Sequence, residues 1–224
     1  MTEAVIFDID GTLLDSVDLH AEAWKEAFEH FGFDFSLPKI RSQVGKGGDQ
    51  LLPEFLSPEE VKEKGKALQE FRGSLFKEKY LSRVKPFPGV RELFEKIKSE
   101  GQQLALASSA KGDELKVFEQ IAKIDDLVEV ETSSADAKRS KPHPDIFEVA
   151  LERLGAKVRR EQVVVVGDSP HDAEAAGKAG LRTVGVLCGG FSEADLRKAG
   201  CVAIFAGPED LLRRYYESPL GEGH

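Results

Sequence analysis

Two carboxylates one residue apart, Asp8 and Asp10, follow a short apolar run near the start of the chain. The run is Ala-Val-Ile-Phe, and a glycine follows the second acid, which is typical of a buried parallel strand that ends in a loop. Ligands bind at the carboxyl ends of such strands in open α/β sheets. Two acids placed there are suited to hold a cation together and to supply a nucleophile.

Three further segments place hydroxyl, basic or acidic side chains after an apolar run or before a helical pattern. They are residues 106–110 (Leu-Ala-Ser-Ser-Ala), 140–144 (Ser-Lys-Pro-His-Pro) and 166–172 (Val-Gly-Asp-Ser-Pro-His-Asp). A lone Asp-x-Asp is usually a solvated loop. Four such segments in this order, three of them preceded by a strand pattern, indicate one shared site.

With Asp-Ile-Asp-Gly-Thr at residues 8–12, these segments resemble the four motifs of the haloacid dehalogenase (HAD) superfamily, in the family's order. The resemblance covers essentially the whole chain. It is to members with a helical C1-type cap, such as phosphoglycolate phosphatases and β-phosphoglucomutases. It implies an α/β fold with a Rossmann-like parallel sheet core and an inserted all-helical cap.

Phosphoryl transfer from a stable monoester needs a nucleophile, and it needs a proton for the leaving oxygen. Asp8 is the candidate nucleophile, because a carboxylate can form an aspartyl-phosphate and divide the reaction into two easier steps. Asp10 is the candidate general acid and then base. We expect the pKa of Asp10 to be raised by the nearby charge of Asp8, which would help Asp10 to hold a proton.

Phosphate oxygens also need donors and positive charge. Ser108 is a candidate donor, and Ser109 could share that role. Lys141 offers a fixed positive charge next to the phosphate and the nucleophile. Gly11 and Thr12 are expected at the same phosphate.

The acids also predict a Mg²⁺ site. Asp168 is the candidate ligand beside Asp8, because Mg²⁺ takes hard oxygen ligands and usually keeps several waters. The resemblance adds the backbone carbonyl of Asp10. Asp172 would bind the metal through water or orient Lys141, and it could also cap the helix that follows.

The elements that must position these residues alternate along most of the chain. Strand-like runs are expected at Ala4–Phe7, Gln103–Ala107, 162–166, 182–187 and 202–205, and helical patterns at 91–100, 113–123 and 144–154. Strands that alternate with helices of this length indicate βαβ units and a parallel sheet. The core is therefore predicted over residues 1–15 and 86–224. We expect the polar, glycine-containing tail at 218–224 to be frayed.

Residues 16–85 contain no convincing strand and are predicted to form the cap. One helix is marked by an apolar face from Val17 to Phe31, and a second begins at Ser57-Pro58-Glu59-Glu60, which carries a cap, a first-turn proline and a glutamate three residues after the cap. Such a lid could exclude water and read the leaving group of the substrate.

Two residues of the cap have open roles. Lys46 lies among three glycines and either reaches a substrate anion or belongs to a plain interhelix turn. His20 is followed four residues later by Trp24, as in the cap of β-phosphoglucomutases, where a histidine links cap closure to acid–base chemistry. His20 is either such a gate at the substrate or a helix-surface residue, and Trp24 fits the apolar face of its helix.

The function predicted from these features is a Mg²⁺-dependent phosphomonoesterase for a small phosphorylated metabolite, such as a sugar phosphate or phosphoglycolate. The alternative is a β-phosphoglucomutase with the same nucleophile. The mutases carry an arginine in the cap loop where this chain has Gly47-Gly48-Asp49. A dehalogenase would lack Asp10, and a catalytically inactive binding protein would have lost one of the motif residues.

Composition excludes other classes of function. The chain has 224 residues, of which 41% are hydrophobic, and a net charge of −9, which argues against nucleic acid or an anionic membrane as the main partner. Cys188 and Cys201 lack metal-site spacing and are expected to be reduced thiols. With neither a membrane-spanning run nor a signal peptide in the sequence, we expect a cytoplasmic protein, as a monomer or a homodimer.

Overall fold

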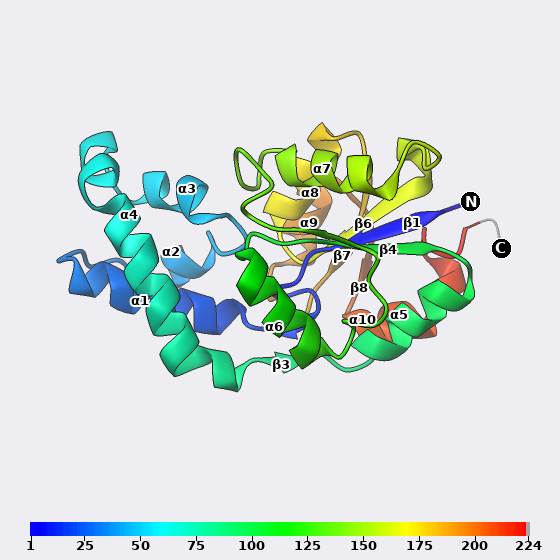
Figure 1. Ribbon diagram of the computed structural model, residues 1–224, viewed down its shortest axis with the longest axis horizontal. Helices are drawn as coiled ribbons and strands as arrows, with labels where there is room; N and C mark the ends of the chain where they lie inside the picture. The colour runs from blue at the N-terminus through cyan, green and yellow to red at the C-terminus, as the bar shows by residue number, and fades with distance from the viewer. Residues whose placement is uncertain (223–224) are drawn as a thin grey trace.

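The computed structural model describes residues 1–222, and its core is a six-stranded sheet (Figure 1). The strand order is β5-β4-β1-β6-β7-β8, and all neighbouring pairs are parallel. The strands are β1 (Ala4–Phe7), β4 (Gln103–Ala107), β5 (Val130–Thr132), β6 (Val163–Gly167), β7 (Arg182–Val186) and β8 (Cys201–Phe205). The chain adds strands on one side of β1 and then on the other, so the sheet has a topological switch point at β1, where such folds bind ligands.

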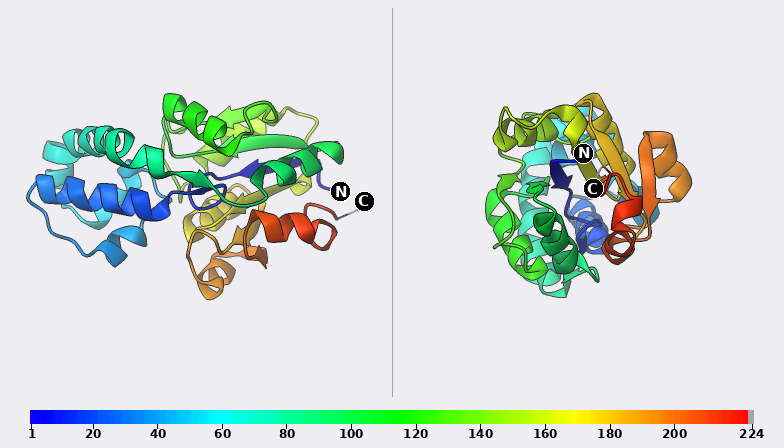
Figure 2. Two further views of the ribbon diagram at one scale, coloured as in Figure 1. Left: turned by 90° about the horizontal axis from the view of Figure 1, so that it is seen from below. Right: turned by 90° about the vertical axis from the view of Figure 1, so that its right-hand side faces the viewer.

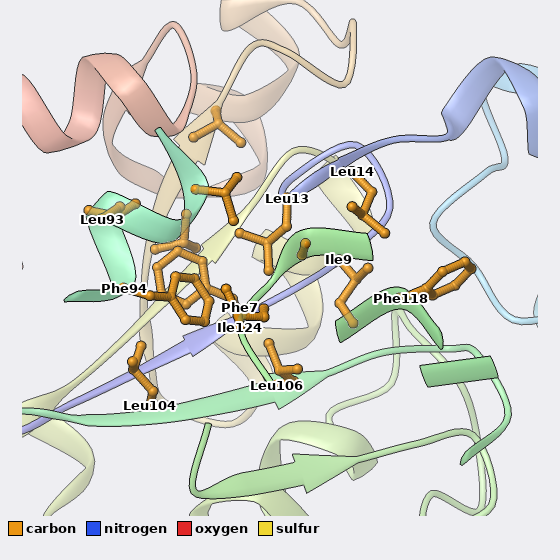
Figure 3. Packing of buried hydrophobic residues seen from close by; sticks show 14 of the residues in the cluster. Phe7, Ile9, Leu13, Leu14, Leu93, Phe94, Leu104, Leu106, Phe118 and Ile124 are labelled. Atoms are coloured by element: carbon orange, nitrogen blue, oxygen red, sulfur yellow. The ribbon is translucent and has the colours of Figure 1, made fainter. Parts of the chain in front are cut away.

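Side chains alternate between the two faces of β1, and each face is covered by helices. Val5 and Phe7 pack in a large apolar cluster with α5 (Val90–Ser99), α6 (Gly112–Ala122) and α10 (Pro208–Arg213). Figure 3 shows Phe7 of this cluster beside Phe94 and Leu106. Ala4 and Ile6 point to the other face, against α7 (Asp145–Leu154) and α8 (Pro170–Lys178). Helix α9 (Glu193–Ala199) packs beside α8 and β8. The sheet is therefore covered on both faces, as expected for a parallel sheet.

The helical insert follows β1 and lies to one side of the sheet (Figures 1 and 2). It contains α1 (Val17–His30), α2 (Leu37–Arg41), α3 (Gly48–Leu51) and α4 (Pro58–Leu75), and α4 continues as a π-helical segment, Phe76–Tyr80. Ser57 caps α4 in a capping box with Glu60, as the sequence predicts. The insert has its own apolar core, which includes Trp24, Phe28 and Leu68. The predicted α/β core with an inserted helical cap is thus confirmed.

A short antiparallel pair marks the place where the chain leaves the core and returns. β2 (Leu14–Asp15) pairs with β3 (Lys85–Pro86), with Leu14 opposite Pro86. Both crossings between core and insert therefore lie side by side. The sequence patterns did not predict these two strands, because each has only two residues and no alternation to detect.

The expectation that the tail is frayed is wrong for residues 218–222. Ser218 and Leu220 are completely buried. The backbone carbonyl of Pro219 accepts a hydrogen bond from Thr2, and that of Leu220 accepts one from Gln102. The tail closes the end of the sheet because its few apolar and hydroxyl groups find partners at the amino end of β1. Residues 223 and 224 lie outside the described part of the chain.

Cys188 and Cys201 are both free thiols. In the part of the chain that the structure describes, no helix is long and apolar enough to cross a membrane.

Candidate active site

Three adjacent strands end side by side and deliver three of the predicted site residues. Phe7 of β1 lies opposite Leu106 of β4 and Val166 of β6, so Asp8, Ser108 and Asp168 all follow at the carboxyl edge of the sheet. The first two continue the ladder, because the backbone N–H of Asp8 donates to Val166 and that of Ser108 to Thr132. All three side chains are at least 94% buried. The register of the sheet therefore positions the site.

Lys141 joins the acids from the loop after β5. Its side chain is fully buried, and its Nζ donates to Oδ1 of Asp8 at 2.5 Å and to the carbonyl of Ala107 at 2.8 Å. The same Nζ lies 2.8 Å from Oδ1 of Asp172. Burial alone would lower the pKa of Lys141, but the charges of Asp172 and Asp8 outweigh burial and raise it. Lys141 is therefore a permanent cation held against Asp8.

Asp8, Asp168 and Asp172 form a buried acidic cluster. Each offers one carboxylate oxygen, and these oxygens all lie within 4.8 Å of one another. Burial, followed by the charge of Asp172, raises the pKa of Asp8 to about 7. Burial and the charges of Asp172 and Asp8 also raise the pKa of Asp168. A set of hard oxygen ligands whose negative charges repel one another is suited to a divalent cation.

The backbone around Asp168 leaves space for its carboxylate only because two glycines face it. A Cβ on Gly189 would lie 1.8 Å from Oδ2 of Asp168, and one on Gly11 would lie 2.4 Å from the same atom. Gly11 also has a φ of +84°, which disfavours other residues. Thr12 lies between two of the acids, with Oγ1 3.3 Å from Oδ2 of Asp8 and 3.3 Å from Oδ1 of Asp168. Gly11 and Thr12 thus border the acidic cluster.

Asp172 both caps a helix and contacts Lys141, two of the three roles that the sequence suggested. It completes a capping box with Ser169 at the start of α8, where its Oδ2 lies 2.6 Å from the serine hydroxyl. Its other oxygen is paired with Lys141. Helix capping fixes the carboxylate, and the fixed carboxylate orients the lysine.

The carboxylate of Asp10 contacts other residues than those that hold Asp8 and Asp168. Its Oδ1 accepts from the hydroxyl of Ser16 at 2.5 Å and lies 2.8 Å from Nε2 of His20. Burial would raise the pKa of Asp10, but His20, Ser16 and Arg72 together lower it below its ordinary value. The expectation of a raised pKa for Asp10 is therefore wrong, because His20, Ser16 and Arg72 outweigh the effect of burial.

His20 connects Asp10 to the cap. Its side chain is 4% exposed, so it is not a surface residue, and its ring stacks on Phe76 at 4.0 Å between centroids. Nδ1 of His20 is hydrogen bonded to a terminal nitrogen of Arg72. A guanidinium only donates, so Nδ1 accepts and Nε2 carries the proton that is donated to Asp10. Both ring nitrogens are thus engaged within the protein.

Two site residues, Arg72 of α4 and Glu114 of α6, were missed in the sequence. Both line a hollow of about 80 Å³ that contains Asp8 and Asp10, and both also line a larger cavity of about 670 Å³ between cap and core. Ser109 lines both spaces as well. A signal was present, because Arg72 lies midway between Leu68 and Phe76 on a buried stripe, and Glu114 lies four residues before Phe118. Charged side chains are rarely buried unless they are paired or functional, so their place among buried residues could have marked both as site candidates.

The glycine loop of the cap contacts the core beside the site. A Cβ on Gly45 would lie 2.9 Å from the hydroxyl of Ser169, and Asp49 accepts from the backbone N–H of Ser140 at 3.1 Å. Lys46 lines the smaller hollow, where its Nζ donates to Gln43 at 2.6 Å and to Glu54 at 2.8 Å. The cap is therefore closed over the acids, and Lys46 is held by residues of the cap itself.

Comparisons with known proteins agree with this geometry. The haloacid dehalogenase-like hydrolase family matches residues 5–186. A phosphorylated carbohydrates phosphatase of Thermotoga maritima is 35% identical over 94% of this chain and 96% of its own length, and a phosphoglycolate phosphatase of Aquifex aeolicus is 28% identical over 83% and 84%. The crystal structure of a hydrolase from Pseudomonas syringae superposes with a TM-score of 0.87 at 28% identity and covers 96% of this chain and 99% of its own. The chain belongs to the haloacid dehalogenase-like hydrolase family and is an enzyme of its phosphatase type.

Proposed function

We propose that this enzyme is a Mg²⁺-dependent phosphomonoesterase that hydrolyses a small phosphorylated metabolite through an aspartyl-phosphate on Asp8. One observation carries the proposal: Lys141 is fully buried and holds Asp8 within a cluster of three acids, beside a hollow that also contains Asp10. This arrangement joins a fixed nucleophile, a cation for phosphate oxygens, ligands for a metal and a second carboxylate.

In the first step, an oxygen of Asp8 forms a bond to phosphorus as the bond from phosphorus to the leaving oxygen breaks. Asp10 gives its proton to that leaving oxygen. Because Ser16 and His20 both bind Oδ1 of Asp10, its Oδ2 remains for the proton and the substrate. We expect the negative phosphate to raise the pKa of Asp10 as it enters, since like charges disfavour ionisation.

In the second step, water attacks the phosphorus and gives a proton to Asp10. The phosphorus–oxygen bond to Asp8 breaks, which releases phosphate and restores the carboxylate. Lys141, Ser108 and Ser109 are proposed to bind the phosphate oxygens, with Gly11 and Thr12 beside them. Asp8, Asp168, the carbonyl of Asp10 and, through water, Asp172 would hold Mg²⁺. When bound, Mg²⁺ neutralises the charge of the acids and the phosphate.

The substrate would bind between cap and core. We infer that the cap spans residues 16–85 and moves on the paired strands β2 and β3, which carry both crossings. The names of the two relatives support a phosphorylated carbohydrate or phosphoglycolate as the substrate. A β-phosphoglucomutase is disfavoured, because the ammonium of Lys46 is held by Gln43 and Glu54, and Asp49 is bound to the core.

The test is phosphate release from a panel of monophosphates, with Mg²⁺ and with excess chelator, for the wild type and Asp8→Asn. The proposal expects release that needs Mg²⁺ and is lost in Asp8→Asn. Full release in excess chelator would contradict it. Conversion of β-glucose 1-phosphate to glucose 6-phosphate with little free phosphate would establish the mutase instead.

A further inference from the structure

Two charged side chains line the substrate space, one from the cap and one from the core, and each has a buried polar atom without a hydrogen-bond partner. Glu114, on core helix α6, is 8% exposed, and its Oε1 is buried without a hydrogen-bond partner. Arg72, on cap helix α4, has a buried Nε that also lacks a partner. Both residues line the hollow that contains Asp8 and Asp10 and the larger cavity beyond it.

The two residues attract each other without touching. Burial lowers the pKa of Arg72, and the charges of Glu114 and then Asp10 oppose that effect, yet no ion pair joins Glu114 to Arg72. An unpaired buried donor or acceptor is unfavourable unless a group binds it in the working complex. A group that accepts from Nε and donates to Oε1 would satisfy both atoms, and both would have to become accessible as it binds.

Arg72 is held in place to meet such a group. A terminal nitrogen binds His20, and the guanidinium lies over the rings of Trp24 and Phe76, 5.2 Å from each centroid. These contacts fix the plane of the guanidinium, and with it the direction of Nε.

We propose that Arg72 and Glu114 together bind a hydroxyl group of the leaving group, so that the enzyme selects phosphorylated polyols over phosphorylated carboxylic acids. This inference rests on the proposed phosphatase function. A hydroxyl both donates and accepts, so it satisfies Oε1 and Nε at once. The carboxylate of phosphoglycolate could accept from Arg72, but it would face the charge of Glu114 in a buried place.

The size of the cavity agrees with a polyol. The space of about 670 Å³ beyond the pair is far more than the two-carbon glycolate needs. Its walls offer further polar groups for hydroxyls, among them Gln69, Ser74 and Ser109.

The test compares Glu114→Gln with the wild type on three kinds of monoester: hexose and pentose monophosphates, phosphoglycolate and p-nitrophenyl phosphate. Glutamine keeps the shape of the side chain and removes its charge. Glu119→Gln is the matched control, because Glu119 lies on the same helix, is 1% exposed and also has an unpaired Oε1, but lines neither space. Thermal melting of both variants checks that they are folded.

We expect the wild type to favour its best sugar phosphate over phosphoglycolate by at least about tenfold in kcat/KM, since a site that binds a hydroxyl rejects ligands that cannot donate. Glu114→Gln should lower that ratio by about tenfold, mainly through the KM of the sugar phosphate. Glu119→Gln should keep the wild-type ratio.

A second measurement needs no stable variant. Deoxy analogues of the best sugar phosphate should include one that loses about tenfold in kcat/KM with the wild-type enzyme. Preference for phosphoglycolate, or a ratio unchanged in Glu114→Gln with no sensitive deoxy analogue, would overturn this inference while p-nitrophenyl phosphate hydrolysis upheld the phosphatase. Absence of metal-dependent hydrolysis of every monoester would overturn the proposed function, and this inference with it.

Discussion

Nε2 of His20 lies 2.8 Å from Oδ1 of Asp10, and Nδ1 of the same ring accepts a hydrogen bond from Arg72. One imidazole therefore connects an arginine of the cap to a carboxylate of the core. Arg72 fixes the tautomer, so that the ring always presents an N–H to Asp10 in the closed state. Opening of the cap would move His20, together with Arg72, away from Asp10 and remove a donor from that carboxylate.

We expect His20→Ala to lower kcat by about 10- to 100-fold, because Asp10 loses a donor that orients it. His20 lowers the pKa of Asp10, so its removal should move the basic limb of the kcat/KM profile to higher pH. The measurement is the pH profile of both proteins. His30→Ala, an exposed residue of the same helix, is the control. A lower rate without a shifted profile would mean that His20 only supports the fold.

Lys141→Met should abolish measurable activity and leave Asp8 and Asp172 as buried acids without their cation. The expected loss in the free energy of unfolding is about 3–5 kcal/mol at neutral pH. The loss should be smaller at pH 5, where protonation removes the repulsion between the acids. Urea unfolding at both pH values measures it, with exposed Lys157→Met as the control. Equal losses at both pH values would contradict this account of the cluster.

Mg²⁺ should raise the melting temperature more at pH 8 than at pH 5.5. The pKa of Asp8 is raised to about 7 in the folded protein without metal, so folded Asp8 keeps a proton between about pH 4 and pH 7 that the unfolded chain has lost. The ionisation of Asp8 therefore lowers the free energy of unfolding as the pH rises through that range. A bound cation stabilises the ionised carboxylate and offsets this loss at pH 8, but at pH 5.5 it must first displace the proton. Calorimetry with Mg²⁺ and with chelator provides the comparison, and equal increments at both pH values would contradict it.

Gly189→Ala should weaken Mg²⁺ binding by about tenfold or more, because the new Cβ would collide with Oδ2 of Asp168. We also expect a loss of about 1–3 kcal/mol in the free energy of unfolding. Gly177→Ala is the control, since its Cβ would meet no atom within 4 Å in helix α8. Titration calorimetry measures the metal affinity. Unchanged affinity in Gly189→Ala would show that Asp168 is not a ligand.

The sequence predicted the parts of the fold that depend on local patterns. Strands Ala4–Phe7 and Gln103–Ala107 have the predicted bounds, because each is a short apolar run between polar residues. Val130–Thr132 was missed, because this edge strand has three residues and exposes Glu131 in part. The buried tail was also missed, because its partners Thr2 and Gln102 are far away in the sequence.

The site also contains residues that local patterns predict and residues that only tertiary packing places there. Asp8, Asp168 and Lys141 could be predicted because they follow strands or belong to compact motifs. Arg72 and Glu114 carried only the signal of a charge among buried residues, which does not say where that charge lies; the packing of cap helix α4 and core helix α6 brings them to the site. The pKa of Asp10 also depends on that packing, since two of the groups that lower it, His20 and Arg72, belong to cap helices.

The most direct test of the central claim is to quench the enzyme in acid during turnover of its best substrate and to locate the phosphoryl group by mass spectrometry. The account predicts a phosphoryl group on the peptide that contains Asp8, formed with Mg²⁺ and absent with chelator or in Asp8→Asn. Metal-dependent phosphate release by an Asp8→Asn variant, or a phosphoryl group on another residue, would contradict it.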